Sequence, residues 1–307
     1  MNYLEQLSAI LRDSGWSQEE LARHLGVSFP ALNAWLRERA APRSGSLSKI
    51  ESLYLDIVGS ETVDADELKA VKLTVRTLKI KTSKIVNSQD SLDTLTLYLT
   101  YHTNTIEGST MTLADVGDVI FEHKVLSNRT SIEQTEARNH QAALYWVLET
   151  LEQAPNLDIT EEFVKGVHLR LMNGIVSDAG QYRRHSVRIV GSHATVANWL
   201  KVSELMSVLV VAANTDSKDD IAKLAQVHAD FEKIHPFSDG NDRTGRLLLL
   251  VMALRAGLMP PVVTKERKHA YYKYLEMAQV RGDYAPLELF VAESMLYTGK
   301  LLGEKGR

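Results

Sequence analysis

The chain has 307 residues, a net charge of −4, and 44% hydrophobic and 24% charged residues, which is typical of a globular protein with one or more domains. This balance argues against a protein that coats nucleic acid, and the absence of cysteine excludes disulfides and thiolate metal sites. The apolar run 247–254 is far below the roughly 18–20 residues that cross a bilayer, and the N-terminus lacks a signal-peptide pattern, so we expect a cytoplasmic protein without a membrane partner.

Two short helix patterns joined by a turn lie in the first sixty residues. Ser17 and Glu20 form a capping box at the start of a predicted helix over 18–25, whose apolar residues share one face. A turn with glycine follows, and Ser28 can cap a second helix that has a buried stripe. This arrangement resembles the helix-turn-helix of phage-repressor-like DNA-binding proteins.

The resemblance implies a helix-turn-helix domain over residues 1–60, with its second helix in the major groove of double-stranded DNA. The residues expected to contact DNA are Ser28, Phe29, Asn33, Arg37, Arg39 and Arg43. A packing or dimerisation element of the same shape is the alternative, because this segment holds about as many acidic as basic residues.

A polar segment of helical pattern follows, and we expect a helical connector over residues 61–110. Its predicted helices run from Asp66 to about Val86 and from Leu92 to Tyr101. Beyond them, Thr103 and Glu107 are four residues apart, a spacing that places two side chains on one face of a helix.

Residues 111–300 form the main predicted domain, which is mostly helical. A helix is expected to begin at Thr160, a capping residue that is followed by acidic residues in the first turn. Residues 187–196 are the main strand-like interval, with a turn at Gly191-Ser192. The fold class that we expect is therefore mainly α, with one short β-hairpin.

Residues 235–246 read His-Pro-Phe-Ser-Asp-Gly-Asn-Asp-Arg-Thr-Gly-Arg and run into an apolar helix pattern. A turn that enters a helix directs free backbone N–H groups at one point, which favours an anion. Two arginines at the same place could clamp phosphates, and a carboxylate could hold the Mg²⁺ that phosphates bring. The segment therefore predicts a nucleotide site with a base, His235, beside it.

This segment closely resembles the signature of Fic domains, His-x-Phe-x-(Asp/Glu)-Gly-Asn-Gly-Arg-x-x-Arg. The matching positions are His235, Phe237, Asp239, Gly240, Asn241, Arg243 and Arg246. Residues 103–108 resemble the family's inhibitory motif, (Ser/Thr)-x-x-x-Glu-(Gly/Asn). The resemblance covers roughly residues 110–295 and implies a helical Fic fold with a short β-hairpin flap.

The resemblance implies a protein adenylyltransferase that transfers AMP from ATP to a Tyr, Thr or Ser hydroxyl of a protein target, the chain itself included. His235 would be the catalytic base, and Asp239 would hold Mg²⁺ between the α- and β-phosphates. The residues implied in nucleotide binding are Gly240, Asn241, Asp242, Arg243, Arg246 and Tyr272.

The resemblance also implies autoinhibition and a way to hold the target. Glu107 would pair with Arg246 in the place of the γ-phosphate, and the inhibitory residues would be Thr103, Glu107 and Gly108. The flap would bind an extended target segment by strand addition. Its residues are Arg188, Ile189, Val190, Gly191, Ser192 and His193. Whether inhibition acts within one chain or across a homodimer stays open.

Asp242 stands where the family usually has glycine, and it leaves the transferred group open, since it adds negative charge where phosphates would lie. The related Doc proteins have lysine at this position and resemble kinases. One alternative is therefore a Fic-like phosphotransferase or another nucleotidyl transferase. The other is a DNA-binding regulator whose Fic domain binds nucleotide without turnover.

Overall fold

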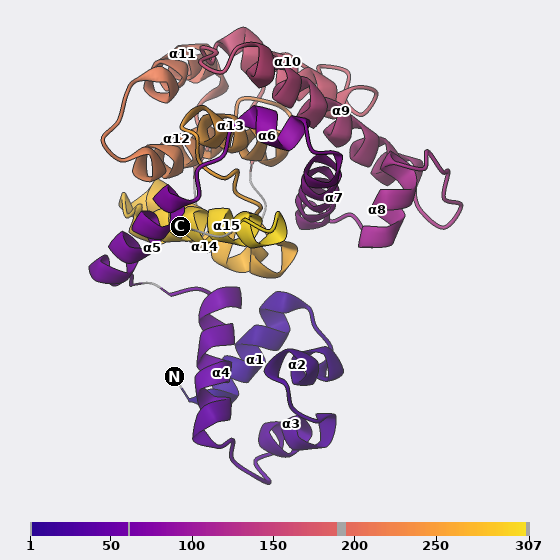
Figure 1. Cartoon of the computed structure of the whole chain (residues 1–307), viewed down its shortest axis with the longest axis vertical. Coiled ribbons are helices and arrows are strands. Elements are labelled where there is room, and N and C mark those ends of the chain that lie inside the picture. Colours follow the sequence, from indigo (N-terminus) through magenta and orange to yellow (C-terminus); the bar gives the residue numbers. More distant parts are fainter. Residues whose placement is uncertain (1, 61, 189–194, 305–307) are drawn as a thin grey trace. The chain divides into compact units, whose positions relative to one another are not determined.

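The structure is a computed structural model that describes residues 2–60, 62–188 and 195–304. Its contacts divide the chain into two compact units, shown as ribbons in Figure 1. The first consists of Met1–Thr62 with Lys265–Tyr274, and the second of Val63–Thr264 with Leu275–Arg307. Among the described residues we find no helix with the length and apolar character needed to span a membrane.

The N-terminal part of the first unit is a small bundle of four helices. They are α1 (Tyr3–Ser14), α2 (Gln18–Leu25), α3 (Phe29–Leu36) and α4 (Ser44–Ile57). The expected local signals are confirmed, because Ser17 forms a capping box with Glu20 and Ser28 caps α3. One cluster of buried side chains joins the four helices, namely Leu7, Ile10, Leu21, Ala22, Leu25, Leu32, Trp35, Ile50 and Ile57.

The second unit is also helical. Its α-helices are α5 (Ala65–Thr77), α6 (Thr82–Val86), α7 (Gln89–Ile106), α8 (Leu113–Ile120), α9 (Ser131–Gln153), α10 (Glu161–Met172), α11 (Val202–Asn214), α12 (Asp220–Ile234), α13 (Asn241–Arg255) and α15 (Ala285–Leu301). Three shorter turns of helix are η1 (Trp199–Lys201), η2 (Lys265–Arg267) and η3 (Met277–Arg281), of which η2 belongs to the first unit. Helix α14 (Lys268–Glu276) begins in the first unit and ends in the second.

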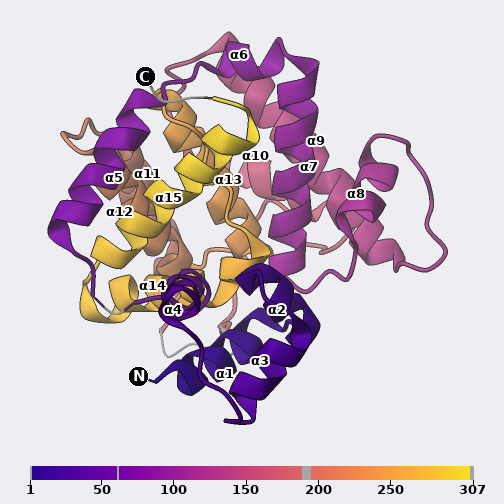
Figure 2. The same cartoon turned by 60° about the horizontal axis from the view of Figure 1, so that its bottom comes forward.

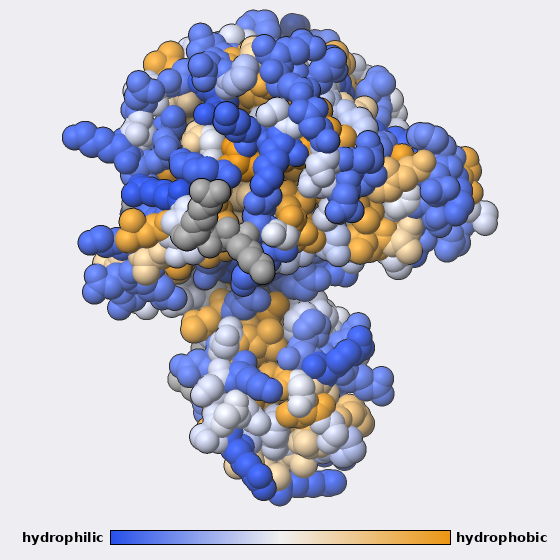
Figure 3. Space-filling model, viewed as in Figure 1, coloured by the Kyte–Doolittle hydropathy of each residue, from blue (hydrophilic) through white to orange (hydrophobic). Residues whose placement is uncertain are grey.

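Helix α13 is the centre of the second unit. Nearly all of its side chains are buried, as expected for residues 247–254, which are apolar all round, while the polar residues of its first turns belong to the site. Helices α7, α9, α10 and α12 pack against it, and Figure 2 shows α7, α9 and α10 around it. The face of the molecule seen in Figure 3 is mainly hydrophilic, with hydrophobic residues in scattered patches. Because four helices pack against α13, its N-terminus is enclosed on several sides.

The single helix expected from Asp66 to about Val86 is wrong. Helix α5 ends at Thr77, and α6 begins only at Thr82. Between them, Lys79 forms an isolated antiparallel bridge with Leu258, and the backbone N–H of Ile80 donates to the carbonyl of Gly257 at 3.1 Å. The chain leaves the helix here because an extended backbone can pair with residues 257–258, which lie far away in the sequence. The second expected helix is confirmed within the longer α7.

The expected β-hairpin falls mainly on residues 189–194, which lie outside the described residues. The flap assignments of Ile189, Val190, Gly191, Ser192 and His193 therefore stay predictions. Arg188, which the structure describes, is not in a strand. Within residues 2–60, 62–188 and 195–304 the only β-type pairing is the isolated bridge of Lys79.

Candidate functional site

The turn between α12 and α13 begins with His235 in an unusual backbone conformation. His235 is the C-cap of α12 and has a φ of 51°, in the left-handed region that costs free energy for a residue with a side chain. Arg183 holds this conformation, since its buried guanidinium donates to the carbonyl of His235 at 2.7 Å and its backbone N–H to that of Pro236 at 2.9 Å. The imidazole of His235 is thereby fixed at the end of α12.

The side chain of Asn241 closes the loop that follows. It accepts a hydrogen bond from the N–H of Phe237 at 2.8 Å and donates to the carbonyl of the same residue at 2.9 Å. Next to it, Gly240 has a φ of 72°, and a Cβ there would lie 2.5 Å from Sδ of Met172. The side-chain amide of Asn241 is thus committed to the loop, which leaves its backbone N–H as its donor for an anion.

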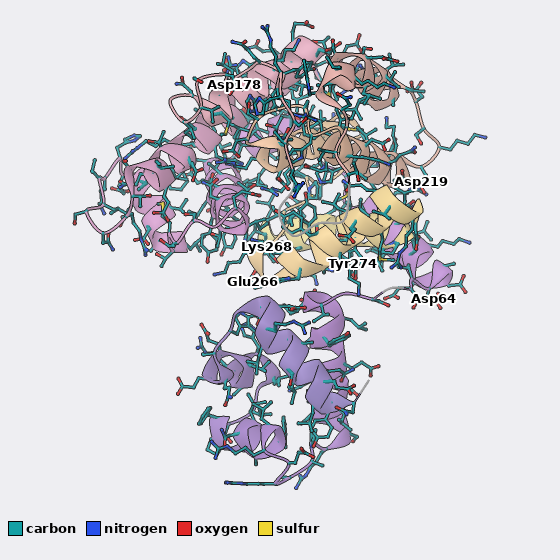
Figure 4. All side chains as sticks on the ribbon, turned by 180° about the vertical axis from the view of Figure 1, so that it is seen from behind. Asp64, Asp178, Asp219, Glu266, Lys268 and Tyr274 are labelled. Carbon is teal, nitrogen blue, oxygen red and sulfur yellow. The ribbon has the colours of Figure 1, made fainter. Side chains whose placement is uncertain are left out.

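His168, on α10, fastens the same loop from the other side. Its Nδ1 accepts from the N–H of Gly180 at 2.8 Å, so its Nε2 carries the proton and donates to the carbonyl of Asp239 at 2.9 Å. Its ring stacks on Phe237, with 3.7 Å between ring centroids. Asp178, labelled in Figure 4, accepts a hydrogen bond from Ser238. The loop is therefore held before any ligand arrives.

Asp239 presents its carboxylate to solvent, with 62% of the side chain exposed. One carboxylate oxygen accepts from the N–H of Gly240 at 2.6 Å. No group of three or more His, Cys, Asp or Glu side chains in the described part of the chain could enclose a metal ion. A single exposed carboxylate nevertheless fits Mg²⁺, which proteins commonly hold through one or two carboxylates together with phosphate oxygens.

The two arginines of the motif are both buried and both paired with carboxylates. Arg243 donates from Nη1 to Oε1 of Glu136 on α9 at 2.7 Å, and its Nη2 lies 4.0 Å from Oδ1 of Asp239. Arg246 donates from Nη2 to Oε1 of Glu107 at 2.6 Å. A buried guanidinium that pairs with a carboxylate can exchange that partner for a phosphate group. Two parallel N–H groups of the planar guanidinium can bind two oxygens of either group.

The end of α7 supplies two contacts to Arg246. The hydroxyl of Thr103 accepts from Nε of Arg246 at 2.6 Å, while Glu107, the C-cap of α7, accepts from Nη2. Gly108 follows with a φ of 105°, which favours glycine. Thr103 and Glu107 thus face the same guanidinium, although the regular helix ends at Ile106.

Burial keeps the imidazole of His235 neutral. It lowers the pKa of His235 to about 4, which leaves the ring uncharged at pH 7. Nδ1 lies 3.3 Å from the carbonyl oxygen of Glu232, and since a carbonyl can only accept, Nδ1 carries the proton. Nε2 is therefore the nitrogen that can accept a proton from another molecule.

Glu232, one turn before His235, is a buried acidic residue near the arginines. Its side chain is buried, and a Cβ at Gly245 would lie 2.1 Å from its Oε1. Burial raises the pKa of Glu232 well above its usual value, and the charge of Asp242 raises it further. Asp242 lies in the first turn of α13, so its charge acts on the helix end as well as on Glu232.

The structure brings together most of the predicted site. Around the N-terminus of α13 lie His235, Asp239, Gly240, Asn241, Asp242, Arg243 and Arg246, with Thr103, Glu107 and Gly108 at the end of α7. Tyr272 belongs to the other compact unit, so its part in nucleotide binding stays a prediction. The sequence analysis assigned no role at the site to the partner residues Glu136, His168, Arg183 and Glu232. Their signal in the sequence is weak, because a buried polar residue is recognisable only by its distant partner.

The predicted DNA-contacting residues lie on or next to α3 in the first unit. Phe29 is 42% exposed, and Arg37, Arg39 and Arg43 are exposed. The hydroxyl of Ser28 accepts from the N–H of Ala31, as a helix cap does, and the amide of Asn33 donates to Gln18 at 3.4 Å. An exposed aromatic ring at the start of α3 is thus followed by three exposed arginines in the segment that leads from α3 to α4.

Comparison with known proteins assigns both domains. Residues 158–253 match the Fic/DOC family model, and residues 7–54 match a helix-turn-helix model. The chain is 31% identical over 197 residues to the protein adenylyltransferase Fic of Aedes aegypti, covering 63% of this chain and 39% of that protein. Its match to the protein of the same name from Nematostella vectensis is 32% identical and covers 62% of this chain and 45% of the relative. The chain thus spans about two fifths of the length of these curated relatives.

A solved structure of Fic-1 from C. elegans has the same fold. It superposes with a TM-score of 0.67 at 23% sequence identity, over 93% of this chain and 84% of that one. Together with the geometry at the N-terminus of α13, these matches identify the two parts of the molecule. The chain contains a Fic/DOC family domain and, N-terminal to it, a helix-turn-helix domain.

Proposed function

We propose that this chain is an autoinhibited protein adenylyltransferase, which transfers AMP from ATP to a hydroxyl group of a protein side chain. The observation that carries the proposal is the convergence of a neutral His235, an exposed Asp239 and two buried arginines at the N-terminus of α13. The curated relatives carry the name protein adenylyltransferase Fic. A cytoplasmic location, with its supply of ATP, is part of this proposal.

The proposed reaction needs one proton acceptor and compensation of negative charge. Nε2 of His235 takes the proton from a Tyr, Thr or Ser hydroxyl, whose oxygen attacks the α-phosphorus of ATP. The bond between the α-phosphorus and the bridging oxygen breaks, and pyrophosphate leaves with the bonding electron pair. The free N–H groups at the start of α13 and the guanidiniums of Arg243 and Arg246 stabilise the charge on the phosphates.

Asp239 is the residue that would hold Mg²⁺ in this reaction. Its carboxylate is exposed beside Gly240, at the helix end where the phosphates would lie. Bound there with ATP, Mg²⁺ would neutralise charge on the α- and β-phosphates. Gly240, Asn241, Asp242 and Tyr272 complete the proposed nucleotide-binding set.

Autoinhibition follows from the contact between Glu107 and Arg246. The 2.6 Å ion pair occupies the donors with which Arg246 would bind the γ-phosphate, and Thr103 holds the same guanidinium at Nε. The proposed inhibitory residues are Thr103, Glu107 and Gly108, the last of which has a positive φ just after the end of α7. Residues 188–193 remain the proposed flap that binds an extended segment of the target protein.

Labelling with ATP that carries ³²P at either the α- or the γ-phosphate tests this proposal. We expect the variant Glu107→Gly to retain α label on itself or on an added protein and to exceed the wild type by at least about tenfold, since an ion pair of about 1.4 kcal/mol no longer blocks Arg246. Retained γ label would instead establish a phosphotransferase, the reaction that Asp242 keeps open. No label in Glu107→Gly, despite ATP binding, would leave a nucleotide-binding regulator.

We also propose that the first unit binds double-stranded DNA through α3. The exposed Phe29 and the arginines at positions 37, 39 and 43 support this, as does the match to a helix-turn-helix model. Asn33 would lie against a base edge, and Ser28 would keep its role as helix cap while its backbone faces phosphate.

Selection from a randomised duplex DNA library, followed by titration at several salt concentrations, tests the DNA proposal. Replacing Arg37, Arg39 and Arg43 by alanine should weaken binding and reduce the slope of log K against log[salt] by about 0.9 for each phosphate that an arginine no longer neutralises. Arg12→Ala, which changes an exposed arginine of α1, is the matched control. If selection enriches no sequence and the triple variant binds like the control, the first unit is a packing element.

A further inference from the structure

Glu136 and Arg243 form the most deeply buried of the ion pairs at the site. Nη1 of Arg243 lies 2.7 Å from Oε1 of Glu136, and their side chains are 5% and 17% exposed. In the pair of Arg246 with Glu107 the carboxylate side chain is 25% exposed. Neither the sequence motif nor the proposed reaction assigns a role to Glu136.

The backbone of Glu136 belongs to a part of α9 that is anchored in the core of the second unit. It lies on α9, a helix of 23 residues, and the next residue, Ala137, is fully buried against α8. One turn on, the amide of Asn139 donates to the carbonyls of Leu171 and Asn173, at 3.0 and 2.8 Å. His140 follows with its Nδ1 2.9 Å from the hydroxyl of Thr100. This face of α9 is fixed to three other parts of the unit.

Glu107 stands in the opposite situation. It is the residue after the last regular turn of α7, and Gly108 follows it in a left-handed conformation. A residue at a helix end, next to glycine, can move at low cost because few backbone hydrogen bonds depend on it. One carboxylate at the site is therefore replaceable, and the other is built into the core.

Arg243 has donors left after it has bonded to Glu136. A guanidinium has five N–H groups, of which the bond to Glu136 uses one. Its Nη2 points toward the Asp239 side, with 4.0 Å to that carboxylate, and its Nε has no hydrogen-bond partner among the described residues. Arg243 is 4% exposed, and its buried Nε–H lacks an acceptor in that part of the chain. A bound ligand could supply that acceptor.

We propose that Glu136 is the positioning residue of Arg243: it remains paired during turnover and fixes the guanidinium so that its remaining N–H groups face the outer phosphates of ATP. The inference rests on the proposed function of this site. It assigns opposite roles to two similar contacts, because Glu107 competes with the phosphates for Arg246, whereas Glu136 prepares Arg243 to bind them. Removing Glu136 should therefore lower activity, and removing Glu107 should raise it.

The test compares Glu136→Ala, Glu136→Gln and the control Glu152→Ala, an exposed glutamate of the same helix, all in the Glu107→Gly protein. Calorimetric titration measures the affinities for ATP and for AMP, and labelling measures kcat and KM. We expect Glu136→Ala to lower ATP affinity and kcat by about 10- to 100-fold, as loss of a supporting partner does, with AMP affinity changed less than about twofold. Glu136→Gln, which keeps an acceptor oxygen, should lose less.

A second comparison separates positioning from a structural role. If Glu136 acts only through Arg243, adding Glu136→Ala to Arg243→Ala should change ATP affinity by less than about twofold. Higher activity of Glu136→Ala, an equal loss of ATP and AMP affinity, or full additivity with Arg243→Ala would each overturn the inference. Absence of ATP binding in Glu107→Gly itself would instead refute the proposed function, and the inference with it.

Discussion

His235 occupies a position that costs free energy twice, through its backbone and through its burial. Its φ of 51° is unfavourable for a non-glycine residue, and burial lowers its pKa to about 4, away from the charged form. Arg183 offsets the first cost with the 2.7 Å bond to the carbonyl of His235. The second cost serves the proposed reaction, because an imidazole that is neutral at pH 7 can accept a proton.

Replacing His235 should separate catalysis from binding. Asparagine tolerates the left-handed region better than alanine, so His235→Asn keeps the turn while it removes the base. We expect His235→Asn in the Glu107→Gly protein to lose at least about 100-fold in α-label transfer, the scale of general-base catalysis, with ATP affinity within about twofold. Calorimetry checks the affinity. Loss of ATP binding would make His235 a structural residue of the loop.

At the scale of the helices, local signals predicted starts and ends better than they predicted interruptions. The caps of α2, α3 and α10 were correct because a cap depends on residues three or four positions apart. The break between α5 and α6 was missed because it depends on pairing of residues 79–80 with 257–258. Polar and apolar periodicity continues through that break, so no local pattern marks it.

The same limit applies to the site. The residues of the turn from His235 to Arg246 were predicted together because they are contiguous, and their types suit phosphate and Mg²⁺. Glu136 lies 107 positions from Arg243, and nothing in its own sequence surroundings distinguishes it from other helical glutamates. The contact of Thr103 with Arg246 spans 143 positions and was accessible only through resemblance to a family motif. Pairings that depend on tertiary structure need coordinates.

A buried lysine of helix α5 pairs with carboxylates of two other helices in the second unit. Lys72 is 8% exposed and bonds to Asp219, the N-cap of α12 that is labelled in Figure 4, at 2.7 Å, and also to Glu288 on α15. Lys72→Met should lower the free energy of unfolding by about 1–3 kcal/mol, because it removes the cation beside Glu288, while Asp219 keeps its ion pair with Arg76 at 3.5 Å. Urea denaturation measures the change.

The exposed Lys69 of the same helix provides the control for this substitution. Lys69→Met should change the free energy of unfolding by less than about 0.5 kcal/mol. If Lys72→Met proved equally mild, the two carboxylates would have to find other partners or protons, and α5 would depend on its apolar contacts alone.

At the scale of the whole molecule, burial of four imidazoles makes stability depend on pH. Burial lowers the pKa of His140 and His228 to about 3 and that of His168 and His235 to about 4. In the unfolded chain the same groups titrate near 6.5. Between pH 6.5 and about 4 the unfolded chain therefore binds more protons than the folded protein, and the free energy of unfolding falls as the pH falls.

Two acids oppose this trend. Burial raises the pKa of Glu232 and of Asp230 in the folded protein, so both favour folding as the pH falls. Each histidine contributes at most about 1.4 kcal/mol per pH unit below 6.5, and each of the two acids at most the same amount with the opposite sign. Since four imidazoles act against two acids, the net loss of stability with acidification should persist.

Urea denaturation at pH 7, 6 and 5 should show this loss, with a midpoint that decreases steadily. His140→Gln removes one of the four groups, so its free energy of unfolding should fall by about 1.4 kcal/mol less per pH unit than that of the wild type. His24→Gln, which changes an exposed histidine, is the matched control. A midpoint constant from pH 7 to 5 would mean that the folded protein binds these protons too, and the interior around Arg243 and Arg246 would then be open to water rather than closed around neutral imidazoles.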